Sequence, residues 1–542
     1  MRKGTFLFVI LALLCRPAEP AQKSSAASIP HLRQQGEASQ LIVDGKPFLM
    51  FGGELGNSSA SDAASMRWIW PRLQQMHLNS VLVPVYWELI EPEEGRFDFA
   101  LVDSILDAAR AHDLRLVLLW FGSWKNSMSC YAPLWVKSVP NRFPRARTRS
   151  GEAQEILTPF SDANLQADRR AFAALMKHLH TVDEKEQTVI MVQVENEIGM
   201  IPEARDHCRE AEKRFAEEVP AELLAVLQKH KQSLQPRLSE AWERQGAPAR
   251  GSWETVFGKG PATDEFFMAW YFARYTNEVA RAGKAEYPLP MYVNAALIRP
   301  GYQPGQYPSA GPLPHLIDIW RAGAPQIDFL APDIYFRNFR EWVMQYDLPG
   351  NPLFIPEVGN SQSPANAFYA VGEHDAMGYS PFSVEDLPDP GRNPLSRAYE
   401  LLHQLQPLLA AHQGMGSMRG VLLDSTDQRA RIELGDYILQ VRHEYSWSYA
   451  QREENVMPRY GGLFIRLADD EFLVAGTGLI IEVAPRAAGV RAGIGSVDEG
   501  GLVDGQWRSG RRLNGDQTHQ GRHIQLPGQS YTLLRVKLYT YR

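Results

Sequence analysis

The chain has 542 residues, of which 44% are hydrophobic, 10% aromatic and 22% charged, and its formal net charge is -7. This length exceeds one ordinary core and predicts a large domain with at least one smaller one, while the composition excludes a dominant disordered region. The mild charge, without a basic stripe, excludes the usual electrostatics of a nucleic-acid binder, so no nucleic-acid partner is expected.

The chain opens with the pattern of a secretory signal peptide. Two basic residues precede an apolar run from Phe6 to Leu14, and small and polar residues follow. We assign residues 1–26 to this leader and expect an exported protein, periplasmic or secreted, without a membrane span, because the run is too short to cross a bilayer. Cys15 raises the alternative of a lipid anchor, although Leu14 precedes it where such motifs have a small residue.

Two further cysteines, Cys130 and Cys208, lie beyond the leader. They are too few for a disulfide framework and show no paired zinc-ligand spacing. The sequence leaves open whether they are bridged or free.

Short β-rich runs alternate with longer helical stretches over residues 40–412, which predicts parallel strands with helical crossovers. Eight candidate strands are found: four end at Glu54, Glu88, Gly122 and Glu197, one begins at Met291, two end at Tyr335 and Gly359, and one begins at Met377. Eight strands are what an α/β fold of the (β/α)8 TIM-barrel type needs. A doubly wound open sheet is the alternative, but no glycine-rich phosphate turn follows the first strand.

The stretch between the fourth and fifth strands is long, with leucines and alanines at helical spacing. We predict a helical insertion after strand four, on the side where barrel strands have their carboxyl ends. It either shapes access to a site there or serves only as a packing appendage.

The pattern changes after Ala411, where a glycine-rich segment predicts a linker. Residues 413–542 then alternate apolar and polar positions without helices, which predicts a smaller C-terminal all-β sandwich domain. Trp447 and Tyr449 are candidates to bind carbohydrate there, with core or turn roles as the alternative.

Two glutamates stand where apolar runs end: Val189–Val194 leads into Glu195, Asn196 and Glu197, and Leu353–Pro356 leads into Glu357. Barrel enzymes carry catalytic groups at these strand ends, and a carboxylate there is costly to bury unless it is paired, hydrogen-bonded or used. For either glutamate alone, a salt bridge is the alternative. Together they predict retaining glycoside hydrolysis, in which one carboxylic acid protonates the leaving oxygen and a second carboxylate attacks.

The residues beside Glu197 predict an irregular strand end. Strict alternation would place Glu195 and Glu197 on one face and Asn196 on the other. We predict a bulge that brings Asn196 to the site, where it would hydrogen-bond a sugar hydroxyl. Glu195 is predicted either to support residues that contact the substrate or to fill the barrel, satisfied by its neighbours, rather than to act as a third catalytic acid.

Three stretches resemble a known family. VQVENEIG, residues 192–199, resembles the acid/base motif of glycoside hydrolase family 35, the β-galactosidases of clan A. WELIEPEEGRFDF, residues 87–99, resembles a stretch of families 35 and 42, and YAPLWV resembles the stretch that follows strand three. With the β-rich tail, the chain looks closest to the Gram-negative branch of family 35.

The resemblance implies a role for each matching residue. Glu197 becomes the acid/base, Glu357 the nucleophile and Asn196 a partner of a sugar hydroxyl. Tyr335 resembles the tyrosine that clan A enzymes aim at the nucleophile, with a plain core aromatic as the alternative.

The chain departs from the commoner family pattern at three positions whose side chains contact the ring hydroxyls of the sugar in family members. Pro84, Glu88 and Asn126 stand where members often have Tyr, Asn and Glu. Glu88 and Asn126 remain candidate substrate-binding residues. Tryptophans near strand ends are candidates to stack on sugar rings or to pack in the core, namely Trp120, Trp124 and Trp320.

The resemblance implies an exo-β-galactosidase that removes terminal β-galactosyl groups from plant-type, xyloglucan-like oligo- or polysaccharides by double displacement. A clan A enzyme for glucose, mannose or α-L-arabinose is the near alternative, and a non-catalytic carbohydrate-binding barrel is the distant one. No cofactor or metal is expected, because His315, His374 and the other histidines lack ligand spacing. The oligomeric state is left open.

Overall fold

A computed structural model describes residues 29–359, 363–444, 458–503, 505–513 and 515–542. The predicted leader with Cys15 lies outside these residues, and so do Trp447 and Tyr449. Among the described residues, no helix is both long and apolar enough to cross a membrane. Cys130 is exposed and Cys208 is buried, and both are free thiols.

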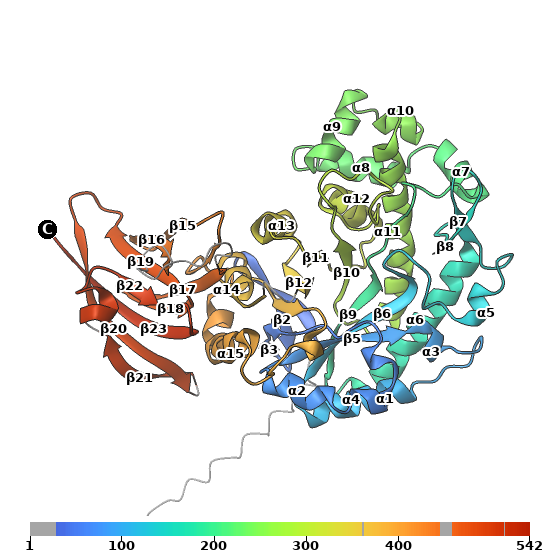
Figure 1. The fold of residues 1–542 in the computed structure, drawn as a ribbon. Coiled ribbons are helices and arrows are strands. Elements are labelled where there is room, and N and C mark those ends of the chain that lie inside the picture. The colour runs from blue at the N-terminus through green and yellow to red at the C-terminus, as the bar shows by residue number, and fades with distance from the viewer. Residues whose placement is uncertain (1–28, 360–362, 445–457, 504, 514) are drawn as a thin grey trace, which may run out of the picture.

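Eight parallel strands form the barrel (Figure 1). In chain order they are β4 (Met50–Phe51), β5 (Ser80–Tyr86), β6 (Arg115–Lys125), β9 (Val189–Asn196), β10 (Met291–Ala296), β11 (Phe329–Ile334), β12 (Phe354–Val358) and β13 (Gly378–Pro381). The barrel closes beyond β4, where Leu82 N–H donates to the Gly53 carbonyl at 2.9 Å and Glu54 N–H to the Pro381 carbonyl at 2.8 Å. The predicted fold class is confirmed.

Continuous aliphatic runs explain why these strands lie at the centre. Every residue of β5 and of β9 is buried, as expected for parallel strands covered on both faces. Two predicted boundaries differ from the structure. β6 continues past Gly122 to Lys125, and β5 ends before Glu88, which lies in the short helix α3 (Trp87–Ile90).

Helices surround the barrel. The main ones are α2 (Ile69–Gln75), α4 (Ala100–Ala111), α6 (Asp162–Asp183), α11 (Pro261–Glu286), α12 (Ile317–Gly323), α13 (Phe339–Tyr346), α14 (Ser363–His374) and α15 (Pro394–His412), with the short α1 (Ala63–Met66) and α5 (Leu134–Lys137) in loops. α11 packs along α6, which makes it the barrel helix that follows β9. The predicted insertion therefore reduces to the four helices that precede α11.

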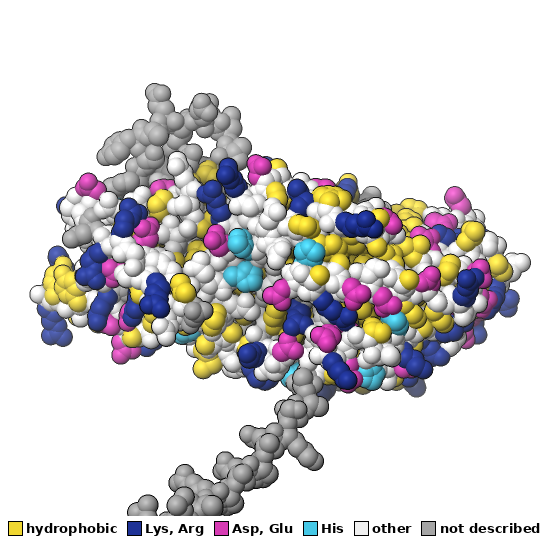
Figure 2. All heavy atoms as spheres, turned by 90° about the horizontal axis from the view of Figure 1, so that it is seen from below, with side chains coloured by type: hydrophobic (Ala, Val, Ile, Leu, Met, Phe, Trp, Pro, Cys, Tyr) yellow, Lys and Arg dark blue, Asp and Glu magenta, His cyan; other side chains and the backbone are white. Residues whose placement is uncertain are grey.

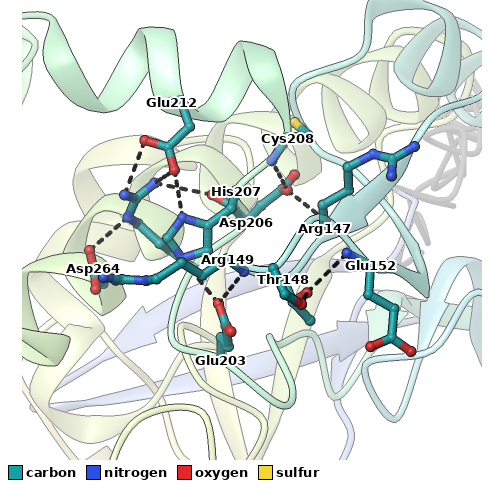
Figure 3. Close-up of polar contacts among 12 residues, drawn as sticks. Arg147, Thr148, Arg149, Glu152, Glu203, Asp206, His207, Cys208, Glu212 and Asp264 are labelled. Carbon is teal, nitrogen blue, oxygen red and sulfur yellow. Dashed lines mark hydrogen bonds and ion pairs between the residues drawn. The ribbon is translucent and has the colours of Figure 1, made fainter.

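The insertion consists of α7 (Arg209–Ala216), α8 (Ala221–Lys229), α9 (Pro236–Arg244) and α10 (Trp253–Phe257), which gather at the top of Figure 1. The residues that lead into α7 are hydrogen-bonded to the hairpin of β7 (Arg145–Arg147) and β8 (Ala153–Leu157), as Figure 3 shows. Asp206 accepts the Arg147 N–H at 2.9 Å, and Arg205 pairs with Asp264 at 2.8 Å. Both segments follow barrel strands at their carboxyl ends, so they border the same face.

The C-terminal region is all β and forms two sheets. One has the order β14 (Met418–Leu423), β17 (Tyr460–Ala468), β18 (Glu471–Gly476), β23 (Thr532–Tyr541), β20 (Arg491–Val503) and β21 (Gln506–Leu513). The other has the order β15 (Arg429–Leu434), β16 (Tyr437–His443), β19 (Leu479–Pro485) and β22 (Ile524–Leu526). Inward side chains of both sheets, including Phe464, Val474 and Ile481, share one apolar core, as in a β-sandwich.

The sandwich packs against the barrel through α14 and α15, which lie between them in Figure 1. The barrel core continues into the sheet face through Leu422 and Leu463. The short connection after His412 is held by a small N-terminal sheet of β1 (His31–Gln35), β2 (Ala38–Val43) and β3 (Lys46–Pro47), where Glu37 N–H donates to the Gly414 carbonyl at 3.1 Å. Basic and acidic side chains are interspersed over the face drawn in Figure 2.

Candidate active site

Four carboxyl groups converge at the carboxyl ends of the barrel strands. Glu54 follows β4, Glu197 follows β9, Asp333 lies in β11 and Glu357 in β12, and all four are buried. One carboxylate oxygen from each of Glu197, Asp333 and Glu357 lies within 4.8 Å of the others. The structure therefore brings the two predicted glutamates together.

Glu357 is held by a tyrosine. The Tyr335 hydroxyl donates a hydrogen bond to Glu357 Oε1, while Oε2 is buried without a hydrogen-bond partner. Burial and the neighbouring charge of Glu197 raise the pKa of Glu357 to about 7, although Lys125 and the Tyr335 hydroxyl oppose the shift. Tyr335, a candidate from the family resemblance, is thus hydrogen-bonded to Glu357, the predicted nucleophile.

Glu197 lies among donors from other strands. Asn126 Nδ2 donates to Glu197 Oε2, and Lys125 Nζ donates in turn to Asn126 Oδ1. The Glu197 main-chain N–H donates to Asn294 Oδ1 at 3.0 Å. Burial raises the pKa of Glu197, and the charge of Lys125 opposes that shift.

An irregularity in β6 turns Lys125 and Asn126 toward Glu197. Between its pairings Trp120–Val194 and Lys125–Asn196, β6 advances five residues while β9 advances two. Extra residues of this kind leave main-chain N–H groups without ladder partners. Two buried carboxylates accept them: Glu195 Oε2 accepts from Trp124 at 2.7 Å, and Asp168 Oδ2 accepts from Ser123 at 3.3 Å.

The end of β9 is irregular too, with left-handed φ angles of +63° at Glu195 and +44° at Glu197. This conformation is uncommon for residues other than glycine, and here it breaks the alternation of side chains. Glu195 meets Asp168 of α6, whereas Glu197 meets Asn126 and Glu357. The end of β9 is thus irregular, as predicted, but the extra residues of the bulge belong to β6, and the approach of Asn196 to the site stays a prediction.

Asn196 is buried, and neither atom of its side-chain amide has a hydrogen-bond partner. Buried amides in proteins are usually hydrogen-bonded, so the Asn196 amide has a donor and an acceptor available for a ligand. The predicted contact with a sugar hydroxyl would satisfy it, and this role remains a prediction.

Other predicted residues lie elsewhere. Glu88 forms an ion pair with Lys137 at 3.6 Å. Stacking on sugar rings is contradicted for the three tryptophans, because each is completely buried and its indole N–H is bonded inside the protein: Trp120 to Asp168, Trp124 to the Leu157 carbonyl and Trp320 to the Ala310 carbonyl. Pro84 is buried within β5.

Sequence reasoning missed four residues of the site: Glu54, Lys125, Asn294 and Asp333. Glu54 and Asp333 stand at predicted strand ends, and Asn294 is the one strongly polar residue in the run MYVNAA. These signals were available. Lys125 was missed because the predicted strand ended at Gly122.

The oxygens of Glu197, Asp333 and Glu357 lie close enough to hold a cation. Donors already occupy this cluster, however. Tyr335 donates to Glu357 and Asn126 donates to Glu197, while the ammonium of Lys125 provides a positive charge beside them. The arrangement fits hydrogen-bonded acids better than a set of ligands for a hard cation, which takes six or more oxygens.

Parts of the sequence match known families. Residues 61–245 match the model of glycoside hydrolase family 42, described as Beta-galactosidase, and residues 395–525 match a domain of unknown function, DUF5597. The first match includes Glu197 and ends before Glu357. It agrees with the resemblance to family 42, whereas assignment to family 35 stays a prediction.

A β-galactosidase of Xanthomonas manihotis is 29% identical over 225 residues, which are 40% of this chain and 33% of that protein. The chain thus spans about a third of the length of the curated relative that it matches. Similar solved structures include a β-galactosidase from Bacillus circulans sp. alkalophilus, with a TM-score of 0.44, 14% identity and coverage of 67% of this chain and 57% of that one. The catalytic domain of a β-amylase from Paenibacillus polymyxa has a TM-score of 0.44, 12% identity and coverage of 63% and 93%.

Proposed function

We propose that this protein is an exported, retaining exo-β-galactosidase that removes terminal β-galactosyl groups from plant-type, xyloglucan-like oligo- or polysaccharides. In this proposal Glu357 is the nucleophile and Glu197 the acid/base. Asn196, Asn126, Tyr335 and Glu88 are the proposed substrate-binding residues.

The separation of the two glutamates carries the proposal. Retaining glycosidases hold their carboxyl groups about 5–5.5 Å apart, whereas inverting enzymes need about 6.5–9.5 Å to admit a water. An oxygen of Glu197 lies within 4.8 Å of one of Glu357, which favours retention. The sugar rests on the β-galactosidase match over residues 61–245 and on the resemblance of the VQVENEIG motif.

The reaction would proceed by double displacement. The Glu357 carboxylate attacks the anomeric carbon while the Glu197 proton passes to the leaving oxygen, so that the glycosidic bond breaks and a glycosyl ester forms. Water then gives a proton to Glu197 and displaces Glu357 with a second inversion. The Tyr335 hydroxyl holds Glu357 Oε1 during attack.

Nitrophenyl glycosides test the sugar and Glu357→Ala tests the mechanism. The wild type should hydrolyse the β-galactoside in preference to the β-glucoside, β-mannoside and α-L-arabinoside. Glu357→Ala should lose this turnover, and azide should restore it with formation of the α-galactosyl azide, because azide fills the place of the nucleophile.

Glu400→Ala is the matched control, since Glu400 is an exposed glutamate on α15 and should leave activity unchanged. Turnover of another glycoside instead of the β-galactoside would contradict the proposed sugar. Azide products of the β configuration would contradict retention through Glu357.

A further inference from the structure

A third carboxyl group lies beside the two proposed catalytic glutamates. Asp333 of β11 is in register with Glu357 of β12, and its side chain is buried. Its oxygen lies within 4.8 Å of those of both Glu197 and Glu357. The two-carboxylate reaction leaves this group without a role.

Asn294 determines which oxygen of Asp333 is an acceptor. The side-chain oxygen Oδ1 of Asn294 accepts the Glu197 main-chain N–H at 3.0 Å, which orients the side-chain amide of Asn294. Its Nδ2 then donates to Asp333 Oδ2 at 2.6 Å. The other oxygen, Asp333 Oδ1, is buried and has no hydrogen-bond partner, and one Asp333 carboxylate oxygen lies within 4.8 Å of oxygens of both Glu197 and Glu357.

The charges around Asp333 disfavour its ionised form. Among the described residues, the charges that act most strongly on Asp333 are those of Glu357, Glu197 and Glu54, and the charge of Asp333 acts on Tyr292, Tyr335 and Tyr346. None of these is a cation, and Lys125 acts on the three glutamates. Burial, followed by the charges of Glu357 and Glu197, raises the pKa of Asp333 well above its usual range.

We propose that Asp333 is a neutral carboxylic acid in the working enzyme and that its Oδ1–H donates a hydrogen bond to Glu197. Asp333 is then a positioning residue, and the inference rests on the proposed function. When Glu197 gives its proton to the leaving oxygen, the donor stabilises the resulting carboxylate and holds it in place to deprotonate the incoming water. The Asp333 proton itself is not transferred.

Two variants separate a neutral donor from an ionised group. Asp333→Asn keeps an acceptor for Asn294 and an N–H donor toward Glu197, so kcat/KM on the β-galactoside should stay within about threefold of wild type, with an unmoved pH profile. Asp333→Ala removes the donor, so kcat should fall about ten- to a hundredfold. Its alkaline limb should move to higher pH, because a lost bond to the charged form raises the pKa of Glu197.

An ionised Asp333 would give a different result. Asp333→Asn would then remove a buried negative charge, the pKa values of both glutamates would fall, and both limbs of the profile would move to lower pH. That outcome would overturn the proposal.

Infrared spectroscopy gives a readout that needs no turnover. At neutral pH the wild type should show the carbonyl stretch of a neutral carboxylic acid, and Asp333→Asn should lose part of that band. Glu265→Gln is the matched control, because Glu265 is as buried as Asp333 but has a lowered pKa. Burial tends to raise the pKa of Glu265, but its interactions, chiefly with His315, lower it by more. Glu265→Gln should therefore leave the band intact.

The two readouts distinguish the possible failures. If Asp333→Asn retains the whole carboxylic-acid band, the proposal that Asp333 is neutral is overturned, whatever the activity of the variant. A band that is lost as expected, in an enzyme that turns over no glycoside, supports the neutral Asp333 and overturns the proposed function instead.

Discussion

At the scale of single residues, Glu197 and Glu357 are chemically identical but have different neighbours. The Tyr335 hydroxyl donates a hydrogen bond to Glu357, which favours the ionised form of Glu357. Glu197 instead accepts from Asn126 Nδ2, and the side-chain oxygen Oδ1 of Asn126 accepts from Lys125 Nζ. Each glutamate raises the other's cost of ionisation, since like charges within a few ångströms disfavour a second negative charge. One proton on Glu197 and none on Glu357 is the state that the proposed reaction needs.

Glu197→Gln tests this protonation state. The charge of ionised Glu197 is, after burial, the largest cause of the raised pKa of Glu357, and this charge is absent while Glu197 holds its proton. The acidic limb of kcat/KM, which reports ionisation of Glu357, should therefore stay in place, whereas the alkaline limb, which reports loss of the Glu197 proton, should disappear. The measurement uses an activated aryl β-galactoside that needs no acid catalyst.

On galactosides with poor leaving groups, Glu197→Gln should lose about 10²–10⁴ in rate, the usual contribution of an acid catalyst. Equal losses on activated and poor leaving groups would contradict the acid/base role. An alkaline limb that persists in Glu197→Gln would contradict the assignment of the proton to Glu197.

At the scale of elements, β6 decides the shape of the site. Its irregular end lets Lys125 and Asn126 reach Glu197 on the neighbouring strand, and Asp168 and Glu195 accept the N–H groups that the ladder leaves unpaired. Burial, then the charge of Asp168, raises the pKa of Glu195 well above its usual range. A buried acid pair thus supports the bulge by accepting the main-chain N–H groups of Ser123 and Trp124.

A second element-scale feature is the contact in Figure 3 between the β7–β8 hairpin and the first residues of the insertion. Asp206 is buried there and accepts from Arg147 N–H at 2.9 Å, Cys208 N–H at 2.7 Å and the Thr158 hydroxyl at 2.5 Å. Asp206→Ala should cost about 1–3 kcal/mol of stability, because buried donors lose their acceptor. Hydrogen exchange should become faster over residues 145–157 and 203–212.

Arg149→Ala is the control for this change. Arg149 contributes its main-chain N–H to Glu203, and the substitution retains that bond. Exchange in the hairpin should remain slow. Equal protection in Asp206→Ala and wild type would show that the contact does not hold the hairpin.

At the scale of the whole molecule, the barrel and the sandwich share a packed junction. Gly372 of α14 lies so close to the sandwich that a Cβ there would meet Leu463 Cβ at 2.7 Å and the Arg419 carbonyl oxygen at 2.9 Å. Gly420 approaches α14 as closely from the other side, with a Cβ distance of 2.7 Å to Glu373 N. The two domains therefore pack backbone against backbone along α14.

Gly372→Ala tests the importance of this junction. Alanine in place of glycine normally stabilises a helix by about 1 kcal/mol. Here overpacking, at about 1–3 kcal/mol, should exceed that gain, so thermal unfolding should shift to lower temperature. Gly391→Ala is the control, because a Cβ at Gly391 meets nothing within 4 Å. A stabilised Gly372→Ala variant would contradict the close junction.

The sequence by itself determined the elements and the candidate pair of glutamates. Strand runs with buried aliphatic residues are local signals, and β10 matches its predicted run, Met291–Ala296. A glutamate after such a run is costly unless it is paired, hydrogen-bonded or used, and the combination of Glu197 and Glu357, not either one alone, predicted the chemistry. Family resemblance added Asn126 and Tyr335.

Only the tertiary structure decided how the strands meet. The distance between Glu197 and Glu357 depends on barrel closure, and the offset in β6 arises from pairing with β9, so neither can be read from local periodicity. Lys125, Asn294 and Asp333 can be recognised as site residues only from their contacts with residues that other parts of the chain bring beside them. The three tryptophans show the converse: residues suited to sugar stacking lie in the core, because packing and not residue type determines which aromatics are exposed.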